Sequence, residues 1–292
     1  MRTLGDIRID RVIEHEGPDF PAARLLPDAT LEALDAHRHW LEPLHLDPAT
    51  QMLVLTTQTY VLRTGRHTIL VDTCVGNDKP RRFHAWWNLK RDTLWLDRLA
   101  AIGVAPESVD FVMCTHLHAD HCGWNTRLVD GRWVPTFPNA RYVFSREEWA
   151  HWEALNQKGA KYSDNVINDS VLPIVEAGRA DIVASDFQFD DSLWFEPTPG
   201  HTPGHIAIRL ASRGRRAVLS GDVLHSAVQC AHPEWSAIGC SDKEQSRRTR
   251  RAFLERYCDI DTLVMTAHFP SPSAGHVRRA GEAFRFEFDP EG

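Results

Sequence analysis

Short apolar runs that end in polar residues recur along this chain and predict strands. Residues 5–14 alternate polar and apolar side chains, the pattern of a half-buried strand. Residues 51–63 and 67–72 flank Thr64-Gly65 and predict a hairpin. Residues 110–114 are apolar and β-rich, which predicts a buried strand.

The second half of the chain repeats this pattern. Apolar runs at 141–144, 193–195 and 263–265 predict three more strands. The runs 206–210 and 217–219 are joined by a short polar turn and predict a second hairpin. The predicted strands therefore fall into two groups.

Helical signals separate the strands. Three longer helices are predicted at 92–102, 145–155 and 241–257. The last two open with the capping boxes Ser145–Glu148 and Ser241–Glu244. This alternation alone indicates an α/β or an α+β protein and does not choose between them.

Three stretches have no period. Residues 18–50 contain five prolines and one predicted helix, 31–37. Residues 76–91, rich in Trp and Phe, form either a loop packed under its neighbours or a pocket wall. Residues 156–180 are a candidate lid. Because no linker or low-complexity tract divides the chain, we expect one domain over 1–292, with an N-terminal extension (about 15–50) packed on it.

Composition narrows the class of protein. The 292 residues are 42% hydrophobic, enough for a sizeable core, and the net charge is −7. An acidic chain does not favour nucleic acid as a partner, and the basic runs 213–216 and 247–251 fit a solvated turn and a solvated helix face. No run approaches eighteen apolar residues, and the six cysteines show no disulfide framework. We expect no membrane partner, reduced thiols and a cytoplasmic location.

The densest chemical signal follows the strand at 110–114. There the sequence H-x-H-x-D-H places His116, His118, Asp120 and His121 within six residues. On a strand end His116 and His118 project to the same side, so they can bind one metal ion, while the other two residues can reach a second. A merely His-rich surface loop is the alternative, but it predicts no distant partner ligands.

Such partners occur at other strand ends. His201 and His205 lie in the repeat Pro-Gly-His-Thr-Pro-Gly-His after the run 193–195. Asp222 and His268 follow the strands at 217–219 and 263–265. Each alone fits a turn, a helix cap or a core histidine. Together with the H-x-H-x-D-H block, they indicate a metal site.

This set of motifs resembles the metallo-β-lactamase superfamily, whose members carry H-x-H-x-D-H, then a histidine, a bridging aspartate and a final histidine. The resemblance covers nearly the whole chain. It implies an α+β fold, the four-layer αββα sandwich, and two metal ions. The implied ligands are His116, His118 and His201 for the first ion, Asp120, His121 and His268 for the second, and Asp222 bridging both.

Two divalent ions imply hydrolysis without a serine or cysteine nucleophile. Metal ions lower the pKa of bound water from 15.7 to roughly 7, so a metal-bridging hydroxide can attack at neutral pH. Asp120, Asp222 and the hydroxide offset most of the metal charge, and the residual positive charge stabilises an oxyanion. Asp120 or a nearby histidine could pass the proton to the leaving group. Zinc suits an imidazole-rich site best, with Mn, Fe or Co as alternatives.

Three further residues have supporting roles in this picture. The resemblance implies that Asp72 sits behind the ligand loop, and His205 is expected to support the ligands rather than to bind metal. Several lactonases of this fold have a tyrosine three residues after the bridging aspartate, and here that residue is His225. His225 either protonates the leaving group or makes a supporting hydrogen bond, and the sequence leaves both open.

Three shorter segments suggest which branch of the superfamily the chain resembles. The segments 77–79, 220–229 and 268–275 resemble methyl parathion hydrolase and related lactonases and arylesterases. His118, where diiron oxygen-reducing relatives carry a carboxylate, favours hydrolysis, and Asp222, where true β-lactamases commonly use Cys, disfavours antibiotic hydrolysis. We expect a hydrolase of a small-molecule lactone or aryl ester, with side activity on phosphotriesters. The alternatives are a phosphotriester hydrolase and a glyoxalase II-type thioesterase. The resemblance also implies a homodimer, which the sequence itself does not test.

Overall fold

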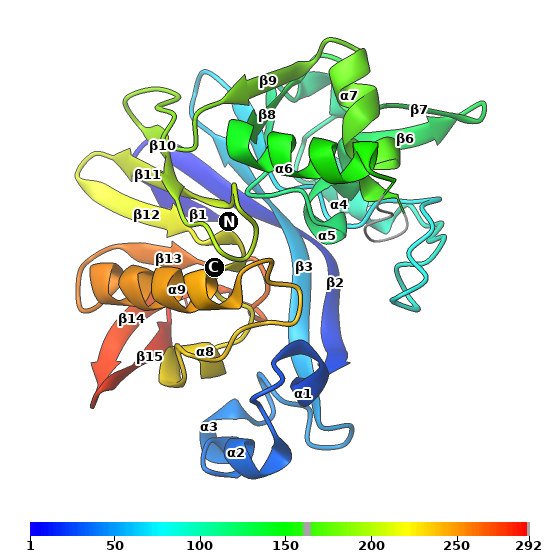
Figure 1. Cartoon of the computed structure of the whole chain (residues 1–292). Helices are drawn as coiled ribbons and strands as arrows, with labels where there is room; N and C mark the ends of the chain where they lie inside the picture. Colours follow the sequence, from blue (N-terminus) through cyan, green and yellow to red (C-terminus); the bar gives the residue numbers. More distant parts are fainter. Residues whose placement is uncertain (160–164, 291–292) are drawn as a thin grey trace. The chain divides into compact units, whose positions relative to one another are not determined.

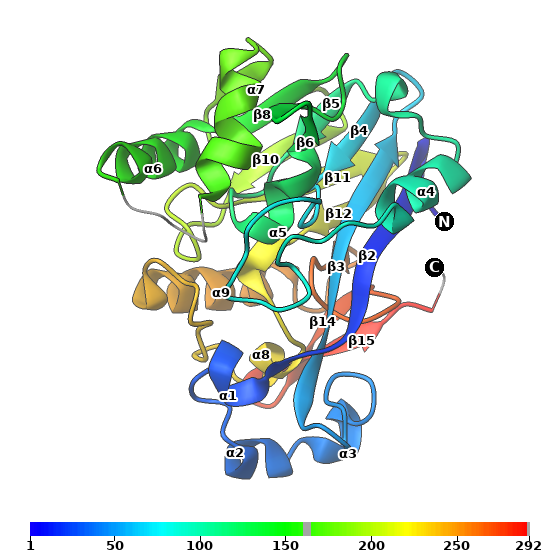
Figure 2. The ribbon, with the colours of Figure 1, turned by 90° about the vertical axis from the view of Figure 1, so that its right-hand side faces the viewer.

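The computed structural model describes residues 1–159 and 165–290. The chain forms two compact units. Unit 1 comprises Met1–Glu14 and Thr57–Ser185, and unit 2 comprises His15–Thr56 and Asp186–Gly292. The strands β2 (Ile7–Pro21) and β3 (Met52–Arg63) are neighbours in one sheet (Figure 2), and the sequence of each is divided between the two units. The prediction of a single domain over 1–292 stays a prediction.

Unit 1 is built on a sheet with the strand order β1-β2-β3-β4-β5-β8-β9. Besides β2 and β3, its strands are β1 (Arg2–Leu4), β4 (Thr68–Val71), β5 (Phe111–Met113), β8 (Arg141–Ser145) and β9 (Ala180–Val183). The strands β4, β5, β8 and β9 pair in parallel. Because parallel strands end at the same sheet edge, the residues that follow β4 and β5 come close together. The hairpin predicted at 51–72 is confirmed as β3–β4.

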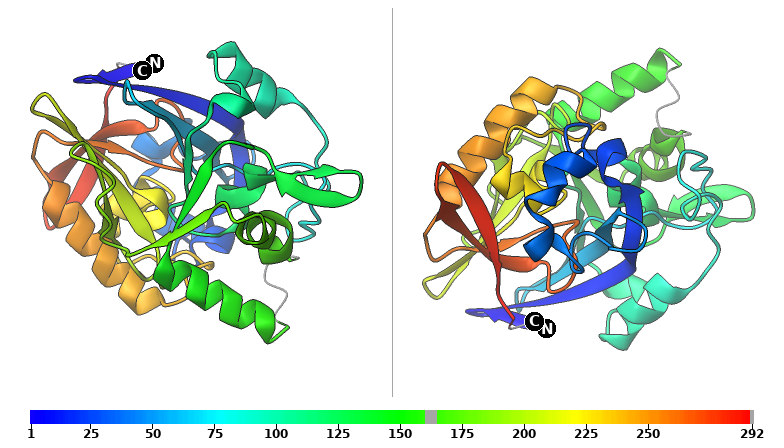
Figure 3. Two further views of the ribbon diagram at one scale, coloured as in Figure 1. Left: turned by 90° about the horizontal axis from the view of Figure 1, so that it is seen from above. Right: turned by 90° about the horizontal axis from the view of Figure 1, so that it is seen from below.

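In the sequence, the helices of unit 1 alternate with these strands. They are α4 (Leu94–Ala101), α5 (Ala119–Cys122), α6 (Arg146–Gln157), α7 (Leu172–Glu176), the 3₁₀ turns η1 (Pro106–Ser108) and η2 (Gly123–Asn125), and the π-helix η4 (Ile167–Val171). The predicted cap of α6 is confirmed, since Ser145 Oγ accepts the Glu148 N–H at 3.2 Å. The small hairpin β6–β7 (Thr126–Val129, Arg132–Pro135) projects from this unit (Figure 3).

Stacked aromatic rings fill the core of unit 1. The Trp95 and Trp124 rings are 5.3 Å apart and 11° from parallel, and Phe137 meets Trp95 edge-on. All three side chains are buried. Trp124 also donates from Nε1 to Glu14 Oε1 at 2.7 Å, which satisfies its indole N–H. This core lies next to η2, just after the histidine-rich segment.

The loop 76–91 is packed under its neighbours at Lys79 and Arg81, whereas Arg82 and Arg91 are exposed. Lys79 Nζ donates to Thr126 Oγ1 at 2.8 Å, and Arg81 makes two bonds to the Asp169 carboxylate at 2.7 and 2.9 Å. Burial lowers the pKa of Lys79 to about 7, against the opposing effect of Asp169. The candidate lid 156–180 is largely helical where it is described, and its residues 160–164 lie outside the described residues.

Unit 2 has a second sheet with the strand order β10 to β15 (Figure 1). The strands are β10 (Leu193–Pro197), β11 (Ile206–Ser212), β12 (Arg215–Leu219), β13 (Leu263–Met265), β14 (Ala274–Ala280) and β15 (Ala283–Phe288). The pair β12–β13 is parallel and the other neighbours are antiparallel. The predicted hairpin β11–β12 is confirmed, whereas the hairpin β14–β15 was not predicted.

Helix α9 (Lys243–Tyr257) covers this sheet. Its residues Phe253 and Leu254 share a buried core with Val218 and Val264. The predicted start of this helix is wrong by one residue. Asp242 is the N-cap and accepts the Gln245 N–H at 2.9 Å. An aspartate one position later supplies the same acceptor that the capping box requires.

The N-terminal extension forms short helices within unit 2: α1 (Ala22–Leu25), α2 (Leu31–Asp35) and α3 (Arg38–Leu41). They lie beside α8 (Val228–Ala231) (Figure 3). Leu26 and Leu34 share a core with Val228 and Trp235.

Two other sequence expectations can be compared with the structure. Within the described ranges no helix is both long and apolar enough to cross a membrane. All six cysteines are free thiols, as predicted.

Candidate metal-binding site

In unit 1 the histidine-rich segment runs from the end of β5 into α5. His116 and His118 lie in the turn after Met113, and Asp120 and His121 lie in α5. The three histidines are buried, and Asp120 is partly exposed. The short strand and one helical turn thus place all four side chains on one small stretch of backbone.

Their donor atoms are close enough to serve common ions. The rings of His116 and His118 are 4.5 Å apart, and those of His116 and His121 are 4.1 Å apart. Asp120 Oδ2 lies 3.7 Å from His121 Nε2. The candidate ligand atoms of His116 and His118 lie within 4.8 Å of each other, as do those of Asp120 and His121.

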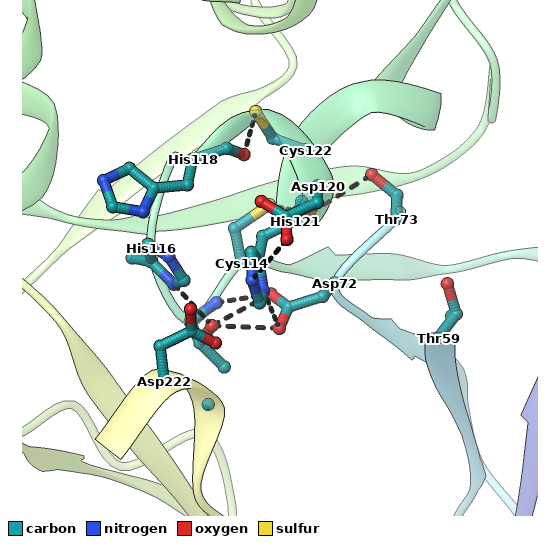
Figure 4. A network of polar contacts seen from close by, with 12 residues as sticks. Thr59, Asp72, Thr73, Cys114, His116, His118, Asp120, His121, Cys122 and Asp222 are labelled. Carbon is teal, nitrogen blue, oxygen red and sulfur yellow. Dashed lines mark hydrogen bonds and ion pairs between the residues drawn. The ribbon is translucent and has the colours of Figure 1, made fainter. Parts of the chain in front are cut away.

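Asp72 braces this segment from β4 (Figure 4). Its carboxylate accepts the Thr115 N–H at 2.7 Å and the Thr115 hydroxyl at 2.9 Å. Asp72 Oδ2 is 2.9 Å from His121 Nδ1, and Thr115 Oγ1 is 3.1 Å from His116 Nδ1. A carboxylate on Nδ1 fixes the imidazole tautomer that leaves Nε2 available as a ligand. This geometry fits the supporting role predicted for Asp72.

Sequence reasoning missed a second brace, Glu148. Its Oε1 accepts the Leu117 N–H at 2.9 Å, in the middle of the histidine segment, and the Trp152 Nε1–H at 2.6 Å. Glu148 is buried. In the sequence it appears only as part of a helix capping box, and nothing local signals its contact with Leu117.

In unit 2 the candidate ligands come from three separate strand ends. His201 follows β10, Asp222 lies in the turn η5 (Gly221–Val223) after β12, and His268 follows β13. All three side chains are buried. The sheet therefore gathers residues that are up to 67 positions apart in the chain, counted from 201 to 268.

Three imidazoles surround the Asp222 carboxylate. His201 Nε2 is 3.2 Å and His225 Nε2 is 3.1 Å from Oδ2, while His268 Nε2 is 3.0 Å from Oδ1. Burial disfavours the charged form of His201, but Asp222 outweighs it and raises the pKa to about 9. For His225 burial prevails over Asp222 and lowers the pKa to about 4.

The Nδ1 atoms of His201, His205 and His268 are held by protein groups. His268 Nδ1 is 2.9 Å from the Thr56 carbonyl oxygen, and His201 Nδ1 is 3.5 Å from Cys240 Sγ. His205 differs, because it uses both ring nitrogens within the protein. Its Nδ1 is 2.8 Å from Thr198 Oγ1, and its Nε2 accepts the Asp222 N–H at 2.9 Å. His205 thus supports the Asp222 turn, and its predicted supporting role stays a prediction.

The donor set fits divalent transition metals. Neutral imidazole and carboxylate are the ligands that Zn, Fe, Co and Mn accept, and no soft thiolate is required. In unit 1 the structure brings together His116, His118, Asp120 and His121, and in unit 2 His201, Asp222 and His268. It also places His225 on Asp222, at the same distance as the candidate ligands.

Comparison with known sequences gives a family match. Residues 53–277 match the family model of the metallo-beta-lactamase superfamily. The N-acyl homoserine lactonase AttM of Agrobacterium fabrum (strain C58 / ATCC 33970) is 27% identical over 209 residues, which cover 68% of this chain and 72% of that protein. An N-acyl homoserine lactonase of Bacillus sp is 24% identical over 179 residues, which cover 58% of this chain and 64% of that protein.

Solved structures show the same fold. A hydrolase named AbOPH, of the beta-lactamase superfamily, superposes with a TM-score of 0.80 at 23% identity, covering 99% of this chain and 97% of that chain. AidC, a dizinc quorum-quenching lactonase in complex with a product, N-hexnoyl-L-homoserine, gives a TM-score of 0.77 at 19% identity, covering 99% and 96%. The predicted α+β class and metallo-β-lactamase fold are confirmed. The methyl parathion hydrolase branch stays a prediction.

Proposed function

Since this chain belongs to the metallo-β-lactamase superfamily and is a metal-dependent, lactonase-like hydrolase, we propose that it cleaves a small-molecule lactone or aryl ester at a dinuclear centre. The observation that carries this proposal is the donor set. Both units present buried imidazoles beside carboxylates, with Nδ1 of several rings held by protein groups. The N-acyl homoserine lactonases of Agrobacterium fabrum and Bacillus sp named above support a lactone as the substrate.

Following the order of the superfamily motif, we propose ligands for two ions. His116, His118 and His201 would hold the first ion, Asp120, His121 and His268 would hold the second, and Asp222 would be shared by both. Zinc is our proposal for the metal, because the ligands are mainly imidazoles, and Mn, Fe or Co would fit the same donors. When bound, the ions would supply Lewis acidity and a hydroxide nucleophile at neutral pH.

The residues of the chain itself would orient the metal ligands and protonate the leaving group. His205 and Thr198 hold the Asp222 turn, and Asp72 holds His121. Asp120 is the most exposed carboxylate of the set, so it can exchange protons with solvent and pass one to the leaving group.

His225 is our candidate for a second group that acts on the leaving group. Its pKa of about 4 keeps the ring neutral at pH 7. A neutral ring that approaches Asp222 through Nε2 has the N–H there, where it points at the carboxylate. We propose that this N–H donates a hydrogen bond to the departing alkoxide, whose proton comes from Asp120. If His225→Phe left kcat unchanged for substrates with poor leaving groups, this role would be wrong, and a supporting hydrogen bond would remain.

The substrate proposal is tested by kcat/KM for a medium-chain lactone, an aryl ester and an aryl phosphotriester, on zinc-loaded protein with a chelated control. We expect kcat/KM for the lactone or the ester to exceed that for the phosphotriester by a hundredfold or more. Activity on all three substrates should disappear on chelation. The reverse ratio would favour the alternative, a phosphotriester hydrolase, which is suggested by the segments 77–79 and 220–229. Low activity on all three would reject the substrate class while leaving the metal assignment standing.

A further inference from the structure

A cysteine lies behind one of the proposed ligands. His201 turns Nε2 toward Asp222 at 3.2 Å and Nδ1 toward Cys240 Sγ at 3.5 Å. Cys240 is 8% exposed and His201 is 4% exposed, so the contact is shielded from water. The thiol therefore contacts the ring on the side opposite to the proposed metal.

The contact continues into helix α9. Cys240 Sγ donates to Ser246 Oγ at 3.3 Å, and Arg250 Nη2 donates to the same oxygen at 2.9 Å. Ser246 and Arg250 are four residues apart, so they lie on one face of the helix. Both are buried.

Arg250 also reaches the Asp222 turn. Its Nε donates to the Val223 carbonyl oxygen and its Nη1 to the Pro233 carbonyl oxygen, each at 2.9 Å. Val223 directly follows Asp222. One buried guanidinium thus links the backbone beside Asp222 to the side chain behind His201.

The donor directions along this path are consistent. A guanidinium has only donors, so Ser246 Oγ must accept from Arg250. Cys240 S–H donates to that oxygen as well, which leaves the sulfur lone pairs free to accept the Nδ1–H of His201. In the neutral ring, a proton on Nδ1 leaves the lone pair on Nε2, which is the form that binds a metal ion.

We propose that Cys240, with Ser246 and Arg250 behind it, is a positioning residue that fixes the tautomer and orientation of His201 for metal binding. The inference rests on the proposed function only in taking His201 as a ligand. It predicts a role for residues outside the sequence motif. The other held rings, His116, His121 and His268, have an oxygen near Nδ1 at 2.9–3.1 Å, so the longer sulfur contact is specific to His201.

The test measures zinc affinity of full-length Cys240→Ala by competition with a chelator, without substrate. Loss of a group that orients a metal-binding histidine typically costs 10–100-fold in metal affinity, and we expect a loss in that range for one of two ions. Cobalt-substituted protein should show altered visible bands, because the orientation of one ligand changes. Cys240→Ser, which keeps a donor and acceptor, should restore part of the affinity.

The matched control is Cys230→Ala. Cys230 is also a buried thiol of unit 2, and it belongs to the apolar core cluster that contains Leu224 and Phe253. We expect it to keep wild-type zinc affinity and cobalt bands. Equal losses in both variants, or wild-type affinity in Cys240→Ala, would overturn the positioning role. If Cys240→Ala does not fold, Ser246→Ala takes its place, and wild-type affinity and bands in that variant would overturn the proposal equally.

Failure of the proposed function gives a different result. Wild-type protein that binds two zinc ions but hydrolyses neither lactone nor ester would reject the substrate class and leave the role of Cys240 intact. Wild-type protein that binds no zinc would overturn both.

Discussion

The two units hold their candidate ligands in opposite ways. In unit 1, four ligands occupy six consecutive positions, and the end of β5 and one turn of α5 set their spacing. In unit 2, His201, Asp222 and His268 come from three strand ends, and the sheet brings them together. A local motif therefore depends on a few braces such as Asp72, whereas the dispersed set depends on the fold of the whole unit.

The first and largest test of this difference removes one ligand from each unit. We expect His118→Ala and Asp222→Ala each to lower metal content and turnover by ~100-fold or more, since loss of a supporting group alone costs 10–100-fold. Asp222→Ala should have the larger effect, because that carboxylate contacts three imidazoles. Metal analysis together with kcat/KM measures both losses.

Asp222→Asn is the control, since it keeps the shape of the Asp222 side chain and removes its negative charge. Wild-type turnover in a variant that binds no metal would exclude the metal mechanism altogether.

The same difference explains what the sequence could predict. The H-x-H-x-D-H block and the position of Asp72 after a strand are local signals, and the geometry fits both expectations. Glu148 and Cys240 were not predicted, because their partners Leu117 and His201 lie 31 and 39 residues away. A side chain that supports a distant loop leaves no periodic pattern in its own segment.

The hairpins show the same limit of prediction from sequence. The hairpins β3–β4 and β11–β12 follow from alternation and a central turn, and both were predicted. The hairpin β14–β15 was missed, although Val277 and Phe284 are buried within it. Its strands are interrupted by charged residues on the exposed side, so the apolar positions do not form a run that sequence alone would single out.

Two glycines next to the ligand segments offer the second comparison. A Cβ on Gly123 would lie 1.8 Å from the Val75 carbonyl oxygen, and one on Gly200 would lie 2.3 Å from the Ser246 backbone nitrogen. Gly200 also has φ +128°, which side chains rarely adopt. Because backbone must move in both cases, we expect Gly123→Ala and Gly200→Ala to lower the free energy of unfolding by about 3 kcal/mol or more.

Gly103→Ala in unit 1 and Gly214→Ala in unit 2 are the controls. Both have φ +78° with no atom within 4 Å of a Cβ, so only backbone strain of about 1–2 kcal/mol is expected. Chemical denaturation measures all four variants. Equal losses of unfolding free energy at the crowded glycines, 123 and 200, and at the open glycines, 103 and 214, would contradict the packing explanation.

The third comparison weakens one supporting residue in each unit. Asp72→Asn replaces an acceptor of the Thr115 and His121 contacts, and His205→Phe removes the acceptor of the Asp222 N–H. Both should lower zinc affinity by 10–100-fold while leaving the ligands themselves in place. Chelator competition gives the affinities. A Asp72→Asn variant with unchanged affinity would mean that the local motif holds His121 without its carboxylate.

The smallest expected effect concerns unit 2 alone and uses pH. His45 is 3% exposed and stacks on Phe288 with ring centroids 5.2 Å apart. Burial lowers its pKa from 6.5 to about 4. Between these values the unfolded chain binds a proton that the folded chain does not, so stability is full above pH 6.5 and falls as the pH drops toward 4.

For this one group, lowering the pH from 7 to 5.5 should cost about 1 kcal/mol of unfolding free energy. His45→Phe keeps an aromatic ring against Phe288 and has no proton to bind, so its stability should fall less over the same range. Urea denaturation of metal-free protein at both pH values measures the difference between the two proteins. An identical pH dependence would show that His45 takes up its proton in the folded state, and that the extension opens to admit water before unit 2 unfolds.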